Sequence, residues 1–201
     1  MRRQYASALL EANRKRQHGN AAFGAGNYQA ALDDYQSVSE TLTNLMDQHQ
    51  IQEGSQDYME FMLAKVPAEI NMVACYSQMG MHDETIALAT KIMKYDTMYM
   101  KRMQHAKLCY RRAMAFGAKK RYMESFKDFD MAMIVAADEV LIRNASKKIT
   151  EEWAESLKTR DYENEDEKKE YDYYCEHGMR PGEDRYGKNA PYVTSLSEML
   201  K

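Results

Sequence analysis

The sequence predicts an all-α protein built from three pairs of helices and closed by a further helix. The 201 residues include nine Gly and only three Pro, which is few turn formers for an all-β fold of this length. Three segments also align with one another on a pattern of small and aromatic residues that is typical of paired helices. Residues 137–160 add apolar residues at helical spacing, which indicates a helix that covers the edge of the last pair.

The first helix pair has the most complete pattern. Gly19 lies in the first helix, Gly26 stands at the turn and Tyr28 follows the turn. The second helix then carries a small residue, Ala31, and an aromatic residue, Tyr35. Small residues where two helices cross let the backbones approach, and aromatic side chains fill the space beside them. One pair cannot bury its apolar face alone, so the pairs are expected to stack.

The second and third segments, residues 71–87 and 110–129, follow the same pattern more loosely. Gly80 stands at the second turn, whereas Lys120 replaces the turn glycine in the third. The spacing between successive turns leaves extra residues, which we place around 41–58 and 97–102 as longer helices joined by loops.

The chain after the third pair divides into a helix and a tail. The apolar positions expected to face the third pair are Val140, Leu141, Ala145, Ile149, Trp153 and Leu157. Residues 161–201 are rich in charge and then in Gly and Pro. For them we expect a charged helix extension that leads into a flexible tail.

These segments resemble the tetratricopeptide repeat (TPR), a helix-turn-helix unit of roughly 34 residues with small residues at the helix crossing. Thr85 and Ser125 depart from the alanine that the family usually has there. The resemblance implies a right-handed superhelix over residues 1–136, followed by a capping helix. The repeats are then expected at about residues 10–45, 60–96 and 100–136. The layout is most similar to the TPR module of immunophilins, the FKBP-type or cyclophilin-type peptidyl-prolyl isomerases.

Five polar residues on the expected first helices form the candidate binding site: Arg16, Asn20, Asn71, Lys107 and Arg111. The first two are four residues apart, and so are the last two, so each pair lies on one face of its helix. In stacked TPR units the first helices line the concave side, which would bring the five side chains together.

The five positions resemble the carboxylate clamp of co-chaperone TPR domains. The clamp has a Lys four residues before the Asn of a Gly-Asn pair, then an Asn in the second repeat, then a Lys four residues before an Arg. Arg16 stands in place of the first Lys, which keeps the charge but changes the geometry. The resemblance implies binding of the Glu-Glu-Val-Asp C-terminus of cytosolic heat-shock chaperones of the ninety- and seventy-kilodalton classes.

The residue types suit that ligand, because a C-terminal Asp carries two carboxylates and needs cations and amide donors to replace water. Phe23 and Met114 are weaker candidates for apolar contacts with the rest of the peptide. An alternative is a TPR scaffold that binds another helical protein or a second copy of itself. A further alternative is the non-catalytic TPR part of a larger peptidyl-prolyl isomerase.

The composition argues against several other classes of protein. The net charge of −3 does not favour nucleic-acid binding, and no apolar run approaches the roughly 20 residues of a membrane-spanning helix. Cys75, Cys109 and Cys175 form no CxxC pair, which disfavours a disulfide framework and a zinc site. We therefore expect a cytoplasmic or also nuclear protein without cofactor or metal, and no catalytic motif in these residues.

Overall fold

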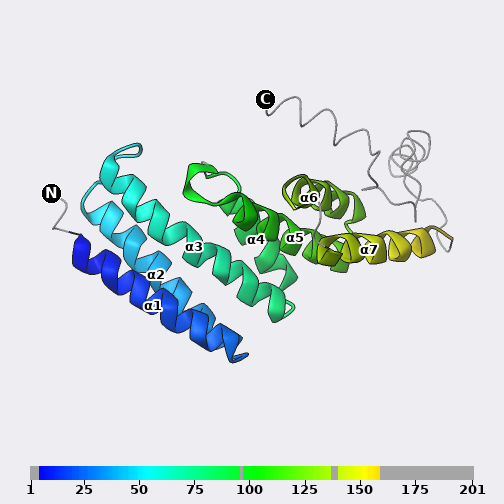
Figure 1. Cartoon of the computed structure of the whole chain (residues 1–201), viewed down its shortest axis with the longest axis horizontal. Coiled ribbons are helices and arrows are strands. Elements are labelled where there is room, and N and C mark those ends of the chain that lie inside the picture. The colour runs from blue at the N-terminus through cyan, green and yellow to red at the C-terminus, as the bar shows by residue number, and fades with distance from the viewer. Residues whose placement is uncertain (1–4, 96, 137–139, 159–201) are drawn as a thin grey trace.

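The computed structural model describes residues 5–95, 97–136 and 140–158, and Figure 1 shows them as a row of stacked helices. The helices are α1 (Ala6–Gly24), α2 (Tyr28–Gln48), α3 (Gln56–Gln78), α4 (His82–Ile92), α5 (Arg102–Ala118), α6 (Tyr122–Val135) and α7 (Val140–Lys158), with a 3₁₀ turn, η1, at Thr97–Tyr99. The described residues contain no strand, so the prediction of an all-α fold is confirmed. The predicted tail, residues 161–201, lies outside the described residues.

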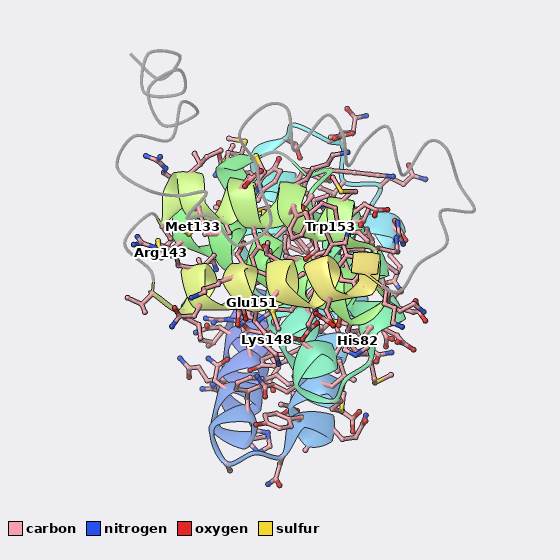
Figure 2. All side chains as sticks on the ribbon, turned by 90° about the vertical axis from the view of Figure 1, so that its right-hand side faces the viewer. His82, Met133, Arg143, Lys148, Glu151 and Trp153 are labelled. Carbon is pink, nitrogen blue, oxygen red and sulfur yellow. The ribbon has the colours of Figure 1, made fainter. Side chains whose placement is uncertain are left out.

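Successive helices pack as pairs and the pairs stack in chain order. α1 packs on α2, α3 on α4 and α5 on α6, while α2 contacts α3 and α4 contacts α5 to join the pairs. Figure 2 looks onto one end of this stack and shows α7 lying across it. Each helix therefore buries a face that its own pair would leave open, as a repeat architecture requires.

Each helix pair turns through a residue with left-handed backbone conformation. Gly26, Gly80 and Lys120 have φ of 80°, 71° and 59°. The three positions predicted as equivalent therefore share one conformation, although the third is not a glycine. A side chain in this conformation meets the backbone carbonyl, which is why glycine is preferred at helix ends of this kind.

Replacing Lys120 with glycine should therefore stabilise the protein, by about 0.5–1 kcal/mol in the free energy of unfolding. Urea denaturation followed by circular dichroism measures the change. Lys119→Gly is the matched control, because Lys119 is also exposed but has φ of −86°. Equal effects of the two substitutions would contradict the account of the turn.

The extra residues between the first two pairs lengthen the helices. α2 continues to Gln48, and α3 starts at Gln56 after a short loop. The Ser55 hydroxyl caps α3 by accepting a hydrogen bond from the Tyr58 amide at 3.1 Å. The smaller insertion forms η1 between α4 and α5.

The residues at the helix crossings are fully buried in all three pairs. Ala31, Thr85 and Ser125 have no exposed surface. The Thr85 hydroxyl donates to the carbonyl of Met81 at 2.7 Å, and the Ser125 hydroxyl donates to that of Ala113 at 2.8 Å. Because a buried hydroxyl is tolerated only when it is hydrogen-bonded, these bonds explain how both residues replace alanine.

α7 packs through part of the predicted set, since Ile149 and Trp153 are buried in the core with α5 and α6 and Ala145 packs against it. Val140 and Leu141 are 63% and 59% exposed, so their assignment to the buried face was wrong. The buried apolar residues are Ile142, Ile149 and Trp153, whose spacing of seven and four residues keeps them on one face of the helix. The side chain of Leu157, also predicted to be buried, lies outside the description.

Contacts with α5 and α6 fix the position of α7. The Trp153 ring meets the Phe126 ring edge-on, with centroids 5.3 Å apart. Gly117 on α5 leaves space for Ile149, since a Cβ at Gly117 would lie 2.5 Å from the Ile149 Cδ1 atom.

Within the described residues, no helix has both the length and the apolar character needed to cross a membrane.

Candidate functional site

The first helices of the three pairs, α1, α3 and α5, carry all five predicted site residues. α3 contacts both α1 and α5, so the three helices present a continuous surface, here called the α1–α3–α5 face. Asn71 and Arg111 each lie nine residues before the left-handed turn residue of their pair. They therefore occupy equivalent places on neighbouring helices.

Two of the predicted amides are in direct contact across α1 and α3. The Asn71 side chain donates its Nδ2 hydrogen to Oδ1 of Asn20 at 2.9 Å. The same Asn20 oxygen accepts a hydrogen bond from the Tyr35 hydroxyl at 2.7 Å. With its oxygen used in this way, Asn20 keeps both Nδ2 hydrogens without a described acceptor, on an exposed side chain. They are available to a ligand.

Gly19 makes this arrangement possible. A Cβ on Gly19 would lie 2.8 Å from Cε1 of the Tyr35 ring, so only glycine lets the ring pass beneath α1. Tyr35 is 1% exposed and comes from α2. The Gly-Asn pair of the predicted motif thus has a physical explanation, because the glycine admits the ring whose hydroxyl orients the neighbouring amide.

Arg16 lies close to this amide cluster. Its Nη2 atom donates to Oδ1 of Asn13 at 2.9 Å. Burial raises the pKa of the Tyr35 hydroxyl, and the positive charge of Arg16 acts in the opposite direction. Arg16 is one turn from Asn20, so its charge and the free amide hydrogens lie on the same face of α1.

Arg111 is a half-buried cation without a described partner. Burial lowers the pKa of its guanidinium, and no hydrogen bond or ion pair links it to any described residue. Its charge acts on the Cys75 thiol, whose pKa burial raises to about 11. Cys75 lies one turn after Asn71 on α3, which places Arg111 beside the second amide.

Lys107 lies one turn before Arg111 and is exposed, again without a described partner. Hydrogen bonds therefore join Asn20 to Asn71, and electrostatic contacts place Arg16 and Arg111 next to that pair. Lys107 is positioned only through its place on α5. The five residues come from three adjoining helices, and no described carboxylate is paired to Lys107 or Arg111.

The two candidates for apolar contacts are partly buried between helices. The Phe23 ring meets the Tyr28 ring edge-on at 5.2 Å and packs into the core of the first pair. Met114 packs against the core formed by α5, α6 and α7. Neither contact tests the prediction that these residues touch a peptide.

A solved structure with similar architecture is the C-terminal TPR-containing domain of an FK506-binding protein from Plasmodium falciparum. It matches with a TM-score of 0.60 and 16% sequence identity, over 75% of this chain and 93% of that one. The chain has the TPR fold. No protein-family model and no curated protein matches the sequence. At this identity the likeness concerns the fold alone.

Sequence reasoning missed one contact of the candidate site, the Tyr35 hydroxyl. Tyr35 was predicted as a packing aromatic of the second helix, and its ring does pack there. The hydroxyl contact to Asn20 depends on how α2 crosses α1, which spacing along one helix does not reveal. The signal that could have found it is the Gly19-Asn20 pair together with a tyrosine, rather than a phenylalanine, at the crossing.

A hollow of about 490 Å³ lies elsewhere on the TPR stack, between α4, α5 and α6. The Phe116 ring in its lining lies 5.7 Å from Cζ of Arg112 and 4.6 Å from Cζ of Arg121. Both guanidiniums already have acidic partners, Asp128 and Glu124. The hollow therefore offers less uncompensated charge to an anion than the α1–α3–α5 face does.

The TPR stack offers little for metal or thiol chemistry in its described part. No three His, Cys, Asp or Glu residues gather there as a metal site would require. Burial raises the pKa of the Cys109 thiol to about 12, so it is protonated at neutral pH. Cys175 lies outside the described residues.

Proposed function

We propose that the chain is a protein-interaction adaptor that binds the C-terminal carboxylates of a partner on its α1–α3–α5 face. The partner we propose is the Glu-Glu-Val-Asp tail of cytosolic heat-shock chaperones. The observation that carries the proposal is Arg111, a desolvated guanidinium without a described counter-ion, next to amide donors and a second cation. A buried charge of this kind is stabilised by an anion that brings its own charge to the site.

The chemistry of the face fits a terminal Asp. Two carboxylates need several donors at once, and the face offers two guanidiniums, an ammonium and the Asn20 amide hydrogens. A hydrogen bond to a charged group contributes about 1.5–3 kcal/mol. Four or five such bonds, less the cost of ordering the peptide, support a Kd on the order of micromolar.

Two exposed apolar side chains, one on α3 and one on α5, suit the residues before the carboxylates. Leu63 and Met103 each lie eight residues before Asn71 and Arg111, so they are equivalent positions on α3 and α5. They are 49% and 47% exposed. Exposed apolar side chains next to a charged site favour a peptide with aliphatic residues upstream of its acidic end.

Calorimetric titration of a pentapeptide that ends in Glu-Glu-Val-Asp tests the proposal. We expect micromolar binding of the free acid and at least about tenfold weaker binding of the same peptide with an amidated C-terminus, since one charged contact contributes about 1.5–3 kcal/mol. Equal affinities for the two peptides would reject carboxylate recognition.

Tyr35→Phe should weaken this binding without unfolding the protein. Loss of the hydroxyl frees the Asn20 amide, and because such a hydrogen bond contributes about 0.5–1.5 kcal/mol, the Kd should rise by up to about tenfold. Tyr28→Phe is the matched control, because the Tyr28 hydroxyl has no described hydrogen bond. The role of Tyr35 is refuted if both variants bind the peptide equally well.

A second candidate function is favoured by the hollow between α4, α5 and α6. Its lining includes Ile86 and Ala87, which suit an apolar face of a helical partner. In that case the chain would act as a scaffold, or as the TPR part of a larger peptidyl-prolyl isomerase. Sedimentation of the protein alone detects self-association, and retained peptide binding by Ile86→Ser separates the hollow from the α1–α3–α5 face.

A further inference from the structure

We propose that the backbone carbonyl of Leu63, which Pro67 leaves without its helical partner, accepts a hydrogen bond from a backbone N–H of the bound peptide. The proposal rests on the proposed function, since it concerns the same face and the same peptide. It adds a contact with the peptide backbone to the contacts with the carboxylates. It also restricts which tails the face can bind.

Pro67 stands in the interior of α3, which continues past it as one helix from Gln56 to Gln78. Proline has no backbone N–H, so the helical hydrogen bond from residue 67 to the carbonyl of Leu63 cannot form. The proline ring also crowds this carbonyl and pushes it aside. The Leu63 carbonyl is therefore an acceptor that has to find its partner elsewhere than in the helix.

This acceptor lies on the α1–α3–α5 face. Leu63, Pro67 and Asn71 are four residues apart, so they follow one line along α3. Leu63 is 49% exposed, and the other two are partly exposed. A helix carbonyl points along the axis toward the next turn, so that of Leu63 lies between the first two residues of the line. The line that carries the Asn71 amide therefore also carries the unpaired carbonyl.

The three first helices differ at the position of Pro67. Asn13, Pro67 and Lys107 each lie thirteen residues before the left-handed turn residue of their pair. At this place α1 has the amide that accepts from Arg16, and α5 has one of the site cations. The middle helix, which contacts both others, has no polar side chain there and contributes a backbone acceptor instead.

A bound peptide needs such an acceptor. Its backbone N–H groups lose water as the peptide enters the site, and a buried N–H without a partner is costly. The side chains of Arg16, Lys107 and Arg111 are donors only and cannot serve. The side-chain oxygen of Asn20 already accepts two hydrogen bonds. The Leu63 carbonyl thus provides an acceptor in a site dominated by donors.

The distance along α3 fits a short tail. Leu63 and Asn71 are eight residues apart, which is about 12 Å along the helix axis. An extended peptide covers about 3.3 Å per residue, so a chain end held at Asn71 brings its last four residues past the carbonyl. The N–H that meets the carbonyl therefore belongs to one of these four residues. A tail with proline at that position lacks the N–H and is bound more weakly.

Replacing single peptide amides with esters tests the proposal. The parent is a free-acid pentapeptide that ends in Glu-Glu-Val-Asp, and each of four derivatives has an ester oxygen in place of one N–H of the last four residues. Pro67→Ala gives α3 a backbone N–H for the Leu63 carbonyl, so the acceptor is then occupied within the helix. Gln56→Ala is the matched control, because Gln56 is exposed on the same helix and the variant keeps Pro67. Calorimetry measures the Kd of each peptide for wild type and both variants.

For one of the four esters, we expect wild type and Gln56→Ala to bind about three- to tenfold more weakly than they bind the parent, the effect of one hydrogen bond. Pro67→Ala should bind the parent about three- to tenfold more weakly than wild type, and should bind that ester as well as it binds the parent. Urea denaturation should show Pro67→Ala to be at least as stable as wild type, since alanine favours a helix interior.

The inference is overturned if every ester changes the Kd by the same factor in wild type and in Pro67→Ala. In that case the proposed function stands as long as the free-acid parent binds and its amidated form binds more weakly. If the free-acid parent does not bind to wild type, the proposed function itself fails.

Discussion

Arg111→Ala should raise the Kd for a free-acid Glu-Glu-Val-Asp peptide by about 10- to 100-fold, because a charged hydrogen bond contributes about 1.5–3 kcal/mol. Arg111 is half-buried beside Cys75, and burial lowers the pKa of its guanidinium. Its charge is therefore poorly solvated in the free protein and gains most from an incoming carboxylate. Calorimetry with the purified variant measures the change.

The same substitution should leave the free protein as stable as wild type, or more stable. No described residue pairs with Arg111, so its removal breaks no ion pair and relieves a desolvated charge. Arg102→Ala is the matched control, since Arg102 is an exposed arginine at the start of the same helix. The role of Arg111 would be contradicted by equal peptide affinities of the two variants. It would also be contradicted by a large loss of stability, which would mark a structural residue.

Asp128→Ala should have the largest effect on stability, about 3–5 kcal/mol in the free energy of unfolding. Asp128 accepts hydrogen bonds from Nε and Nη2 of Arg112, both at 2.6 Å, and the two side chains are 5% and 17% exposed. Burial lowers the pKa of Arg112, but Asp128 more than offsets this and the net pKa is raised. Arginine does not give up its proton, so the variant would keep an unpaired charge between α5 and α6. Urea denaturation measures the loss.

Replacing both Arg112 and Asp128 distinguishes the effect of an unpaired buried charge on stability from the effect of side-chain packing. Arg112→Met combined with Asp128→Leu removes both buried charges, and such replacements are often neutral or stabilising. We expect the double variant to be far more stable than Asp128→Ala alone. A loss of less than about 1 kcal/mol in Asp128→Ala would show that the pair contributes no more than an exposed ion pair.

Much of the fold follows from local sequence signals. The turn positions at Gly26, Gly80 and Lys120 share a left-handed conformation, as their alignment implied. The prediction for α7 was only partly correct, because apolar residues at helical spacing do not by themselves show which face of the helix is buried. Val140 and Leu141 begin the helix and point away from the third pair, whereas Ile149 fits against Gly117. Docking of α7 thus depends on a small residue in another helix.

The candidate site could likewise be predicted only in part. The pairing of residues four apart on α1 and α5 follows from helix geometry and was predicted from spacing. The contact between Asn20 and Asn71 joins residues 51 positions apart and depends on the stacking of two helix pairs. The hydroxyl of Tyr35 comes from a third helix, and only the assembled structure brings it beneath Asn20.

The most direct measurement is a double-mutant cycle between Arg111 and the C-terminal carboxylate of the peptide. Wild type and Arg111→Ala are each titrated with the free-acid and the amidated Glu-Glu-Val-Asp peptide. If the guanidinium contacts that carboxylate, the coupling energy should be at least about 1.5 kcal/mol. If the effects of the substitution and of amidation on the binding free energy are additive to within about 0.5 kcal/mol, the two groups do not meet. That result would contradict carboxylate recognition on the α1–α3–α5 face.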